Sequence, residues 1–543
     1  MNPIKNSASI IRLPIIIAIA LVGGIFIGAK MFNSDTQVND ISKSANKFRD
    51  IISYINSEYV DTVNTDQLTE EAINKMLEKL DPHSVYIPPK DMDMAKAQLE
   101  GDFEGIGIEF TILKDTLYVV TPISGGPSEA VGLQSGDKIV MVDGKNIASV
   151  KLSTQDVFKY LRGKKGTKVN LSILRRGQKK LLEFTITRDK IPTFSVDVAY
   201  MVDKEVGYIK VNRFTANTYN EFKKALTDLK AKGLKKLVLD LRGNPGGYMD
   251  RATQMADEML DGNRMIVFTK SKQTRYNTET KAYLNGIFEK GPIIVLIDEG
   301  SASASEIVSG ALQDNDRALI VGRRSFGKGL VQMPIPLGDN SELRLTISRY
   351  YTPSGRSIQK PYVKGDEDYN MDLVNRYKHG EFFSADSIKF DEKNKYKTTK
   401  GRTVYGGGGV MPDIFIPRDT SMYTGYLNQL FNSGIVREYT QEYGFAKKKE
   451  LEKMSFEQFR KSFEVTDAML ADINKMAQKA DIKFIEKDFL RSKEFIKNQV
   501  KALIARTVWK NEGFFPVFNE QDEMFNKALN LFDKAEKIEQ GVF

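Results

Sequence analysis

The sequence predicts a protein of several domains arranged around an α/β core. Residues 191–362 alternate buried strands, turns and helices, which is the pattern of such a core. Between Phe445 and Gly513 there is no Gly or Pro, so residues 419–543 are expected to form an all-helical domain. An uncharged apolar run stands near the N-terminus, at residues 13–29. At about 100–200 residues per domain, the length leaves room for roughly three or four domains.

Composition excludes several classes of function. The hydrophobic fraction is 41% and the charged fraction 28%, which is ordinary for globular domains. The net charge is +9, but 80 basic residues are interleaved with 71 acidic ones, which argues against nucleic acid as a partner. There is no Cys, so disulfides, thiolate catalysis and cysteine-ligated metals are excluded. The only histidines are His83 and His379, too few for a histidine-rich metal site; we expect no metal and no cofactor.

The N-terminus predicts a membrane anchor. Residues 13–29 carry no charge and lie between Arg12 and Lys30, and this length is the short end of a transmembrane span. No Ala-x-Ala cleavage spacing follows, so we expect an uncleaved signal anchor, with residues 1–12 as a cytoplasmic tail. A cleaved signal peptide remains the alternative. Either would place the rest of the chain outside the cytoplasm, at the inner membrane of a bacterial cell and on its periplasmic side.

A helical segment is expected over residues 33–100. One helix presents a single apolar face, and a second runs from about Asp66 to Leu80 and ends at Asp81-Pro82, because proline cannot continue it. The apolar face of the first helix contains Phe48, Ile51, Ile52, Ile55 and Tyr59.

Residues 101–190 change to short strands and turns. They contain the glycine pair Gly105 and Gly107, a Leu-Gln-Ser-Gly-Asp stretch from Leu133, and an amphipathic helix over residues 154–161. This combination resembles a PDZ domain. The resemblance implies that the loop Gly105-Ile106-Gly107-Ile108 presents backbone N–H groups to the carboxylate of a peptide C-terminus, with the peptide added as a strand.

The α/β core is expected over residues 191–362 and 401–418. Its buried strands are predicted at 237–241, 293–297 and 318–321, with a glycine-rich turn after the first of them. Residues 363–400 are charged and poorly periodic, so they are predicted to be an insertion or a flexible loop.

The candidate nucleophile lies where a buried strand runs into small residues. Ser303 stands just before a helix that begins near Ala304, and free N–H groups at a helix N-terminus can stabilise an oxyanion. Serine before a helix is more often a simple cap. Lys328, between Gly327 and Gly329, adds a second group: a serine nucleophile needs a base, and a desolvated lysine can replace the scarce histidine.

Five ordered motifs resemble the C-terminal processing (tail-specific) serine peptidases, over about residues 45 to 418. They are Leu-Asp-Pro-His-Ser at 80–84, Asp-Leu-Arg-Gly-Asn-Pro-Gly-Gly at 240–247, Ser-Ala-Ser-Ala-Ser-Glu at 301–306, Phe-Gly-Lys-Gly-Leu-Val-Gln at 326–332 and Tyr-Thr-Pro-Ser-Gly-Arg-Ser-Ile-Gln at 351–359. The insertion and the helical C-terminal domain depart from the family pattern.

The resemblance implies a site and a fold. The nucleophile falls on Ser303, the general base on Lys328 and the lysine-orienting amide on Gln332. The oxyanion donors would be the Ala304 N–H and a glycine N–H from Gly246 or Gly247, and His83 would be structural. The core would be a crotonase-like mixed sheet with helices.

The same resemblance implies an activity and partners. The chain is expected to be a serine endopeptidase that binds the C-terminal tails of protein or peptide substrates and cleaves them through an acyl-enzyme. A homo-oligomer or an adaptor protein is left open as a further partner.

Two competing interpretations remain. Gly322 to Lys328 has the Gly-x-x-x-x-Gly-Lys spacing of a P-loop, but Gly329 follows where a P-loop needs Ser or Thr for magnesium. The other is a PDZ adaptor with an inactive peptidase core. The intact Ser303, Lys328 and Gln332 argue against it.

Overall fold

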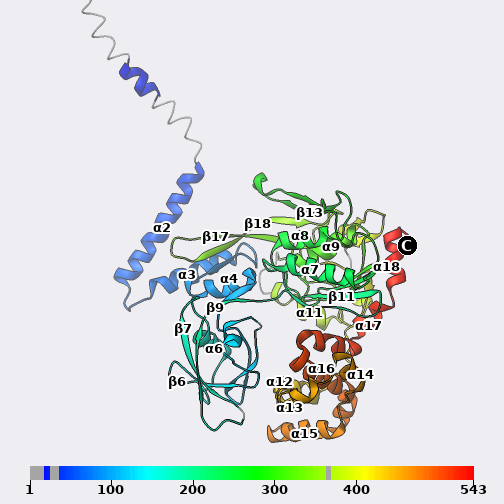
Figure 1. Ribbon diagram of the computed structural model, residues 1–543. Helices are drawn as coiled ribbons and strands as arrows, with labels where there is room; N and C mark the ends of the chain where they lie inside the picture. The colour runs from blue at the N-terminus through cyan, green and yellow to red at the C-terminus, as the bar shows by residue number, and fades with distance from the viewer. Residues whose placement is uncertain are drawn as a thin grey trace, which may run out of the picture. The chain divides into compact units, whose positions relative to one another are not determined.

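The structure of the protein is a computed structural model that describes residues 17–24, 36–123, 125–175, 177–362, 369–389 and 391–542. The chain divides into two units, Met1–Leu77 and Glu78–Phe543. In the first, α2 (Thr36–Glu58) and α3 (Thr65–Leu77) are joined by a short turn (Figure 1).

The predicted anchor and tail fall mostly on residues that are not described. Residues 1–12 lie outside the described part, and of residues 13–29 only 17–24 are described, as helix. Among the described residues, no helix combines the length and the apolar character that crossing a membrane requires.

The segment that resembles a PDZ domain is a small antiparallel sheet with two helices, of which the first is the short α5 (Pro127–Ala130). The sheet order is β3-β4-β5-β7-β8, and the strand before it, β2 (Asp102–Gly105), pairs with the strand after it, β9 (Asp189–Pro192). Helix α6 (Thr154–Leu161) begins at a capping box formed by Ser153 and Asp156. The sheet strands are β3 (Ile108–Leu113), β4 (Thr116–Pro122), β5 (Lys138–Val142), β7 (Lys168–Leu174) and β8 (Leu182–Thr187), with β6 (Lys145–Asn146) beside β5.

The core is a mixed six-stranded sheet of order β10-β11-β12-β15-β16-β21. Its first pair is antiparallel and the others are parallel, as the predicted mixed sheet requires. The strands are β10 (Val196–Met201), β11 (Val206–Val211), β12 (Lys236–Asp240), β15 (Ile293–Ile297), β16 (Ala318–Gly322) and β21 (Ile414–Phe415).

The two faces of this sheet are covered by different parts of the chain, because strand side chains alternate in direction. Leu237 and Leu239 pack with helices α7 (Thr218–Ala231), α8 (Met249–Asp257) and α9 (Ala304–Asp314). Val238 packs instead in a cluster with residues of the last two helices, α17 (Glu523–Leu529) and α18 (Phe532–Gln540). The end of the helical domain therefore completes the core.

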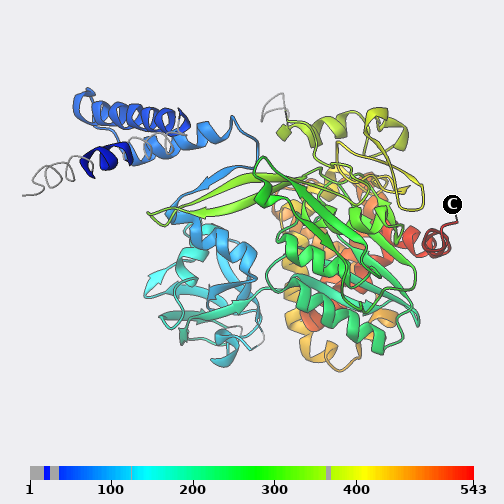
Figure 2. The same ribbon diagram turned by 90° about the horizontal axis from the view of Figure 1, so that it is seen from above.

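A second sheet carries the long hairpin of β17 (Leu330–Pro336) and β18 (Glu342–Tyr351), which Figure 2 shows as an extended ribbon. Strand β1 (Val85–Ile87) pairs antiparallel with β18. This pairing brings the Leu-Asp-Pro-His-Ser motif, which precedes β1, to the hairpin. The other strands of this sheet are β13 (Met265–Lys270) and β14 (Glu279–Lys281).

The remaining elements are mostly helical. The described part of 363–400 contains α11 (Asp372–Lys378) and β19 (Lys395–Lys397), which pairs with β20 (Thr403–Tyr405). Helix α4 (Met92–Glu100) precedes β2. The C-terminal helices are α12 (Gly425–Asn432), α13 (Ile435–Leu451), α14 (Phe456–Ser462), α15 (Asp467–Lys479) and α16 (Glu486–Phe518), and they enclose an aromatic-rich core of their own.

Candidate active site

Ser303 caps α9 in a strained backbone conformation. Its φ is 55° and its ψ is −111°, a region that residues with a side chain rarely occupy. Such strain persists only where the surroundings hold it, and it is common at functional sites. The two neighbouring serines have structural partners, because Ser301 Oγ donates to the Leu241 carbonyl and Ser305 Oγ to the Asn244 carbonyl, both at 2.9 Å.

Glu306 joins the backbone of Ser303 to the backbone of Lys328. Its Oε2 accepts the Ser303 N–H at 2.8 Å and the Lys328 N–H at 2.9 Å. Its Oε1 accepts the Ser325 hydroxyl at 2.5 Å and the Gly327 N–H at 2.7 Å. Burial raises the pKa of Glu306 to about 7, against these hydrogen bonds, which lower it. One fully buried carboxyl group therefore sets the spacing between the two segments that carry the candidate nucleophile and base.

A tyrosine hydroxyl reinforces the same junction. The Tyr350 hydroxyl lies 3.1 Å from the Ser303 carbonyl oxygen and 2.8 Å from the Lys328 carbonyl oxygen.

Burial lowers the pKa of the Lys328 amine; the charges of Glu306 and Asp81 oppose this shift, and the charge of Arg344 adds to it. A lysine with a lowered pKa is neutral, and so able to accept a proton, over a wider pH range.

Gln332, on β17, is held by a relay that ends at Asp81. Gln332 Nε2 donates to Thr346 Oγ1 at 3.3 Å, and Thr346 Oγ1 donates to Asp81 Oδ1 at 3.0 Å. A carboxylate only accepts, so the single Thr346 hydrogen points to Asp81 and its oxygen accepts from the amide. Asp81 also accepts the N–H groups of His83 and Ser84. The relay fixes the orientation of the Gln332 amide.

The titration of His83 is affected by the charge of Lys328. Its Nε2 is 2.7 Å from the Tyr369 hydroxyl. Burial first, and then the positive charge of Lys328, lower the pKa of His83 to about 4, so the ring is neutral near pH 7. The family resemblance implied only a structural role for His83.

The glycine pair lies against the candidate nucleophile. A Cβ on Gly246 would stand 2.7 Å from Ser303 Cβ and 2.9 Å from the Ala304 nitrogen, so no side chain fits there. A Cβ on Gly247 would collide with the Phe214 carbonyl oxygen at 2.0 Å. The Gly246 N–H already donates to Asn244 Oδ1 at 2.9 Å.

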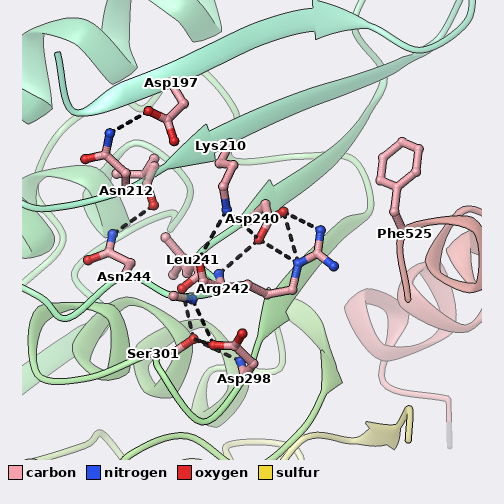
Figure 3. A network of polar contacts seen from close by, with 12 residues as sticks. Asp197, Lys210, Asn212, Asp240, Leu241, Arg242, Asn244, Asp298, Ser301 and Phe525 are labelled. Carbon is pink, nitrogen blue, oxygen red and sulfur yellow. Dashed lines mark hydrogen bonds and ion pairs between the residues drawn. The ribbon is translucent and has the colours of Figure 1, made fainter. Parts of the chain in front are cut away.

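A buried ion pair fixes the turn that carries these glycines (Figure 3). Arg242 Nη2 and Asp240 Oδ2 are 2.6 Å apart at the end of β12. Burial alone would raise the pKa of Asp240, but the charges of Arg242 and Lys210 hold it below its usual range. Asp298, at the end of β15, accepts the Gly243 N–H at 2.8 Å. The ends of two adjacent strands are thereby tied together beneath the site.

A separate cavity of about 280 Å³ contains the predicted carboxylate-binding loop. It is lined by residues 105–108, by Phe103 and Phe110, and by side chains from α6 and the residue after it, Arg162. The Arg162 guanidinium lies 4.1 Å from the centre of the Phe158 ring, and its buried Nε has no hydrogen-bond partner among the described residues. Burial lowers the pKa of Arg162.

Sequence reasoning missed Glu306, Asp81, Thr346 and Arg162 as functional candidates. Three of them carried a usable signal, and that of Asp81 is its place in the Leu-Asp-Pro-His-Ser motif. Glu306 stands three residues after Ser303, which is capping-box spacing, and Arg162 directly follows the predicted helix of the peptide-binding segment. The relay through Thr346 had no local signal, because its partners are far apart in the chain.

Comparison with known families gives four matches. The profile of peptidase family S41 matches residues 205–369, and that of a PDZ domain matches residues 105–186. The profile of the N-terminal domain of the activating protease CtpB matches residues 25–91, and a family of unknown function, DUF8443, matches residues 426–510.

Similar proteins agree with these matches. The carboxy-terminal-processing protease of Bartonella bacilliformis is 38% identical over 411 residues, covering 74% of this chain and 92% of that protein. The carboxy-terminal processing protease CtpB of Bacillus subtilis is 35% identical over 361 residues, covering 65% of this chain and 72% of that protein. Among solved structures, the photosystem II D1 C-terminal processing protease is 28% identical and covers 68% of this chain and 86% of its own, with a TM-score of 0.35.

The family matches and the similar proteases, together with a PDZ domain that precedes a mixed-sheet core, define a serine protease. The chain belongs to the PDZ-containing carboxy-terminal processing proteases of peptidase family S41.

Proposed function

We propose that Ser303 is the nucleophile and Lys328 the general base of an endopeptidase that works through an acyl-enzyme. The observation that carries the proposal is the Glu306 carboxyl group, which binds the backbone N–H groups of both residues at 2.8 and 2.9 Å. A fully buried acid that couples a strained serine to a desolvated lysine is an arrangement that a purely structural core does not need.

The chemistry runs in two halves. The neutral Lys328 amine takes the proton of Ser303 Oγ as that oxygen attacks the scissile carbonyl carbon. The lysine then gives the proton to the leaving amine, and the C–N bond breaks. In the second half Lys328 takes a proton from water, whose oxygen attacks the ester; the acid product leaves and Ser303 recovers its proton. The side-chain Nε2 of Gln332 donates to Thr346, and its side-chain oxygen is proposed to orient the Lys328 amine.

The oxyanion is proposed to be held by the Ala304 N–H and a glycine N–H. Ala304 opens α9, so its N–H belongs to the free first turn of a helix. The Gly246 N–H is engaged by Asn244, which favours the Gly247 N–H as the second donor. The close approach of Gly246 to Ser303 leaves this side of the site open to backbone groups only.

Substrate tails are proposed to bind in the cavity of the PDZ domain. Residues 105–108 supply backbone N–H groups for the terminal carboxylate, and Arg162 supplies a positive charge with an unused buried N–H. An arginine whose burial lowers its pKa gains from a new anionic partner. The apolar walls, among them Val157 and Leu161, favour tails that end in apolar residues.

We also propose a cellular location for this activity. The uncharged run at residues 13–29 supports a signal anchor in the inner membrane, with the protease domain on the periplasmic side. Fusion of residues 1–35 to a reporter protein that is active only outside the cytoplasm tests this orientation, and an inactive reporter would contradict it.

The proposed catalytic function is tested with an unfolded protein substrate and the Ser303→Ala variant. Alanine removes one oxygen from a small residue, so the fold should persist while cleavage is lost. The matched control is Ser309→Ala on the same helix, whose hydroxyl donates to the Ser305 carbonyl at 2.9 Å. It should keep activity. Cleavage by Ser303→Ala at the wild-type rate would overturn the assignment.

A further inference from the structure

Residues 369–383, which contain α11, make direct contact with the loop that carries Lys328. Arg376, on α11, is buried, with 4% of its surface exposed. Its Nη1 donates to the Ser325 carbonyl at 3.0 Å and its Nη2 to the Arg324 carbonyl at 2.7 Å. Its Nε donates to Glu381 Oε1 at 2.9 Å. The planar fork of one arginine thus caps two successive carbonyls that immediately precede the lysine loop.

Glu381 forms ion pairs with two arginines, Arg376 and Arg324. Besides Arg376, it binds Arg324 through two hydrogen bonds of 2.5 and 2.6 Å. Arg324 and Ser325, at the start of the loop, are therefore both held by side chains of this segment. A fork of this kind has a defined geometry, unlike the point charge of a lysine.

Lys360, which precedes this segment, joins the segment to the middle of the loop. The Lys360 ammonium lies 4.0 Å from the centre of the Phe326 ring and 3.9 Å from that of Tyr369, a favourable cation–π sandwich. The Lys360 N–H donates to the Gly327 carbonyl at 2.9 Å, and its Nζ donates to the Tyr369 carbonyl and to Asp372. Phe326 and Gly327 are the two residues before Lys328.

The third contact of this segment joins Tyr369 to His83. The Tyr369 hydroxyl is 2.7 Å from His83 Nε2, and the two rings meet edge to face at 5.3 Å. The positive charge of Lys328 lowers the pKa of His83. Tyr369 therefore links the segment to His83, whose N–H donates to Asp81, and the charge of Asp81 acts on Lys328.

We propose that residues 369–383 form a brace that positions the Lys328 loop, with Arg376 and Tyr369 as its positioning residues. The inference rests on the proposed function, because Lys328 must be the base for its position to matter. Neither residue contacts the reacting atoms. The brace keeps the loop pressed against α9, so that the lysine amine stays desolvated and within reach of Ser303.

The brace makes a specific kinetic prediction. A loosened loop admits water to the Lys328 amine, so the pKa of that amine rises toward its ordinary value and less of it is neutral at a given pH. The turnover number kcat should fall, and the acid limb of the pH profile should move to higher pH. KM for a tail-bearing substrate should hardly change, because tails are bound by the separate PDZ cavity.

The experiment compares Arg376→Lys with Arg317→Lys in the full chain. Arg317 is a matched control: it is also buried, and its guanidinium caps the carbonyls of Met259, Phe288 and Gly291. Lysine keeps the charge in both variants but loses the fork. For Arg376→Lys we expect kcat to fall about tenfold or more, as for one or two lost hydrogen bonds, with KM within about twofold. For Arg317→Lys we expect an unchanged acid limb.

A second measurement does not depend on cleavage. Hydrogen exchange of peptides that cover residues 324–330 is measured in the Ser303→Ala background. Arg376→Lys should speed exchange there, whereas Arg317→Lys should not. If wild type shows no cleavage that depends on Ser303, the proposed function fails, while this measurement still decides the brace.

A milder variant keeps the test decisive if Arg376→Lys does not fold. Tyr369→Phe removes the hydroxyl that contacts His83 and Gln359, and it should lower kcat about two- to tenfold with the same shift of the acid limb. Its control, Tyr426→Phe, removes a hydroxyl that donates to Asn474 at 2.7 Å in the helical domain. The brace is overturned if the Arg376 and Tyr369 variants match their controls in pH profile and in exchange.

Discussion

Glu306 accepts the backbone N–H of Lys328 at 2.9 Å although its carboxyl group is fully buried. The same oxygen accepts the N–H of Ser303, so the distance between the two candidate catalytic segments depends on one side chain. A buried carboxyl is costly unless its hydrogen bonds are satisfied, and here both oxygens are. The residue therefore belongs to the architecture of the site, and its replacement should affect chemistry before binding.

Glu306→Gln should lower kcat by about 10- to 100-fold, because the amide presents donors to N–H groups that need acceptors. KM should change little. Glu258→Gln is a matched control: Glu258 is also buried and accepts from Tyr219, Lys223 and the Ile287 N–H. Steady-state kinetics check both variants, with thermal unfolding to compare their stability. Equal losses of kcat in the two variants would remove the special role of Glu306.

Lys328→Arg should be nearly inactive at every pH, because a guanidinium does not lose its proton. In the wild type, an ammonium cannot accept a proton, so activity should rise with pH as Lys328 becomes neutral. Burial lowers the pKa of Lys328, and this places the rise below the ordinary lysine value of 10.5. A kcat/KM profile that falls over this range, or an active arginine variant, would exclude lysine as the base.

Arg344 offers a check on the sign of this shift. Its positive charge lowers the pKa of Lys328, so Arg344→Gln should raise that pKa and move the acid limb to higher pH. The measurement is the pH dependence of kcat/KM at low ionic strength. Added salt should shrink the difference between variant and wild type, since it screens the charge. An acid limb that moves to lower pH in Arg344→Gln would contradict the effect of Arg344 on the pKa of Lys328.

Thr346→Val should lower kcat about tenfold by breaking the relay from Asp81 to Gln332, at nearly constant side-chain volume. Thr346→Ser keeps the hydroxyl and should retain most activity. A role in packing alone would penalise serine more than valine, because serine leaves a small cavity. Kinetics of the two variants side by side therefore separate the relay from simple packing.

Tail recognition predicts a difference between free and amidated substrates. Hydrogen bonds to a charged group contribute roughly 1.5–3 kcal/mol each, so amidation should cost about 10- to 1,000-fold in kcat/KM. Arg162→Gln should weaken cleavage of the free tail and narrow the gap between the two substrates. The assay uses one unfolded protein below saturation. Equal cleavage rates for the free and the amidated substrate would show that the cavity does not bind the terminal carboxylate.

Local patterns predicted much of the fold. Helix α6 and strand β15 have the predicted bounds, and α3 ends at Leu77, a few residues before the proline that limits it. Ser303 and Lys328 stand among small residues, and the resemblance of the short motifs to a known family added Gln332 to the same hypothesis. These signals depend only on neighbours in the sequence.

Long-range packing could not be predicted in this way. Thr346 and Asp81 are 265 residues apart, and they meet only because β1 pairs with β18. Arg376 lies in a segment without clear periodicity, and its function depends on carbonyls that the sequence does not reveal. The last two helices cover the second face of the core sheet, although their sequence indicated only a helical domain.

The most direct test of the central claim is to trap the acyl-enzyme. A slowly released ester substrate is mixed with the protein, quenched in acid and digested with trypsin, and the peptide that covers residues 291–317 is sequenced by mass spectrometry. This peptide contains Ser301, Ser303, Ser305 and Ser309, so fragmentation distinguishes the candidates. The account predicts an acyl group on Ser303 alone, and none in Ser303→Ala. An acyl group on another residue, or cleavage that persists without Ser303, would contradict it.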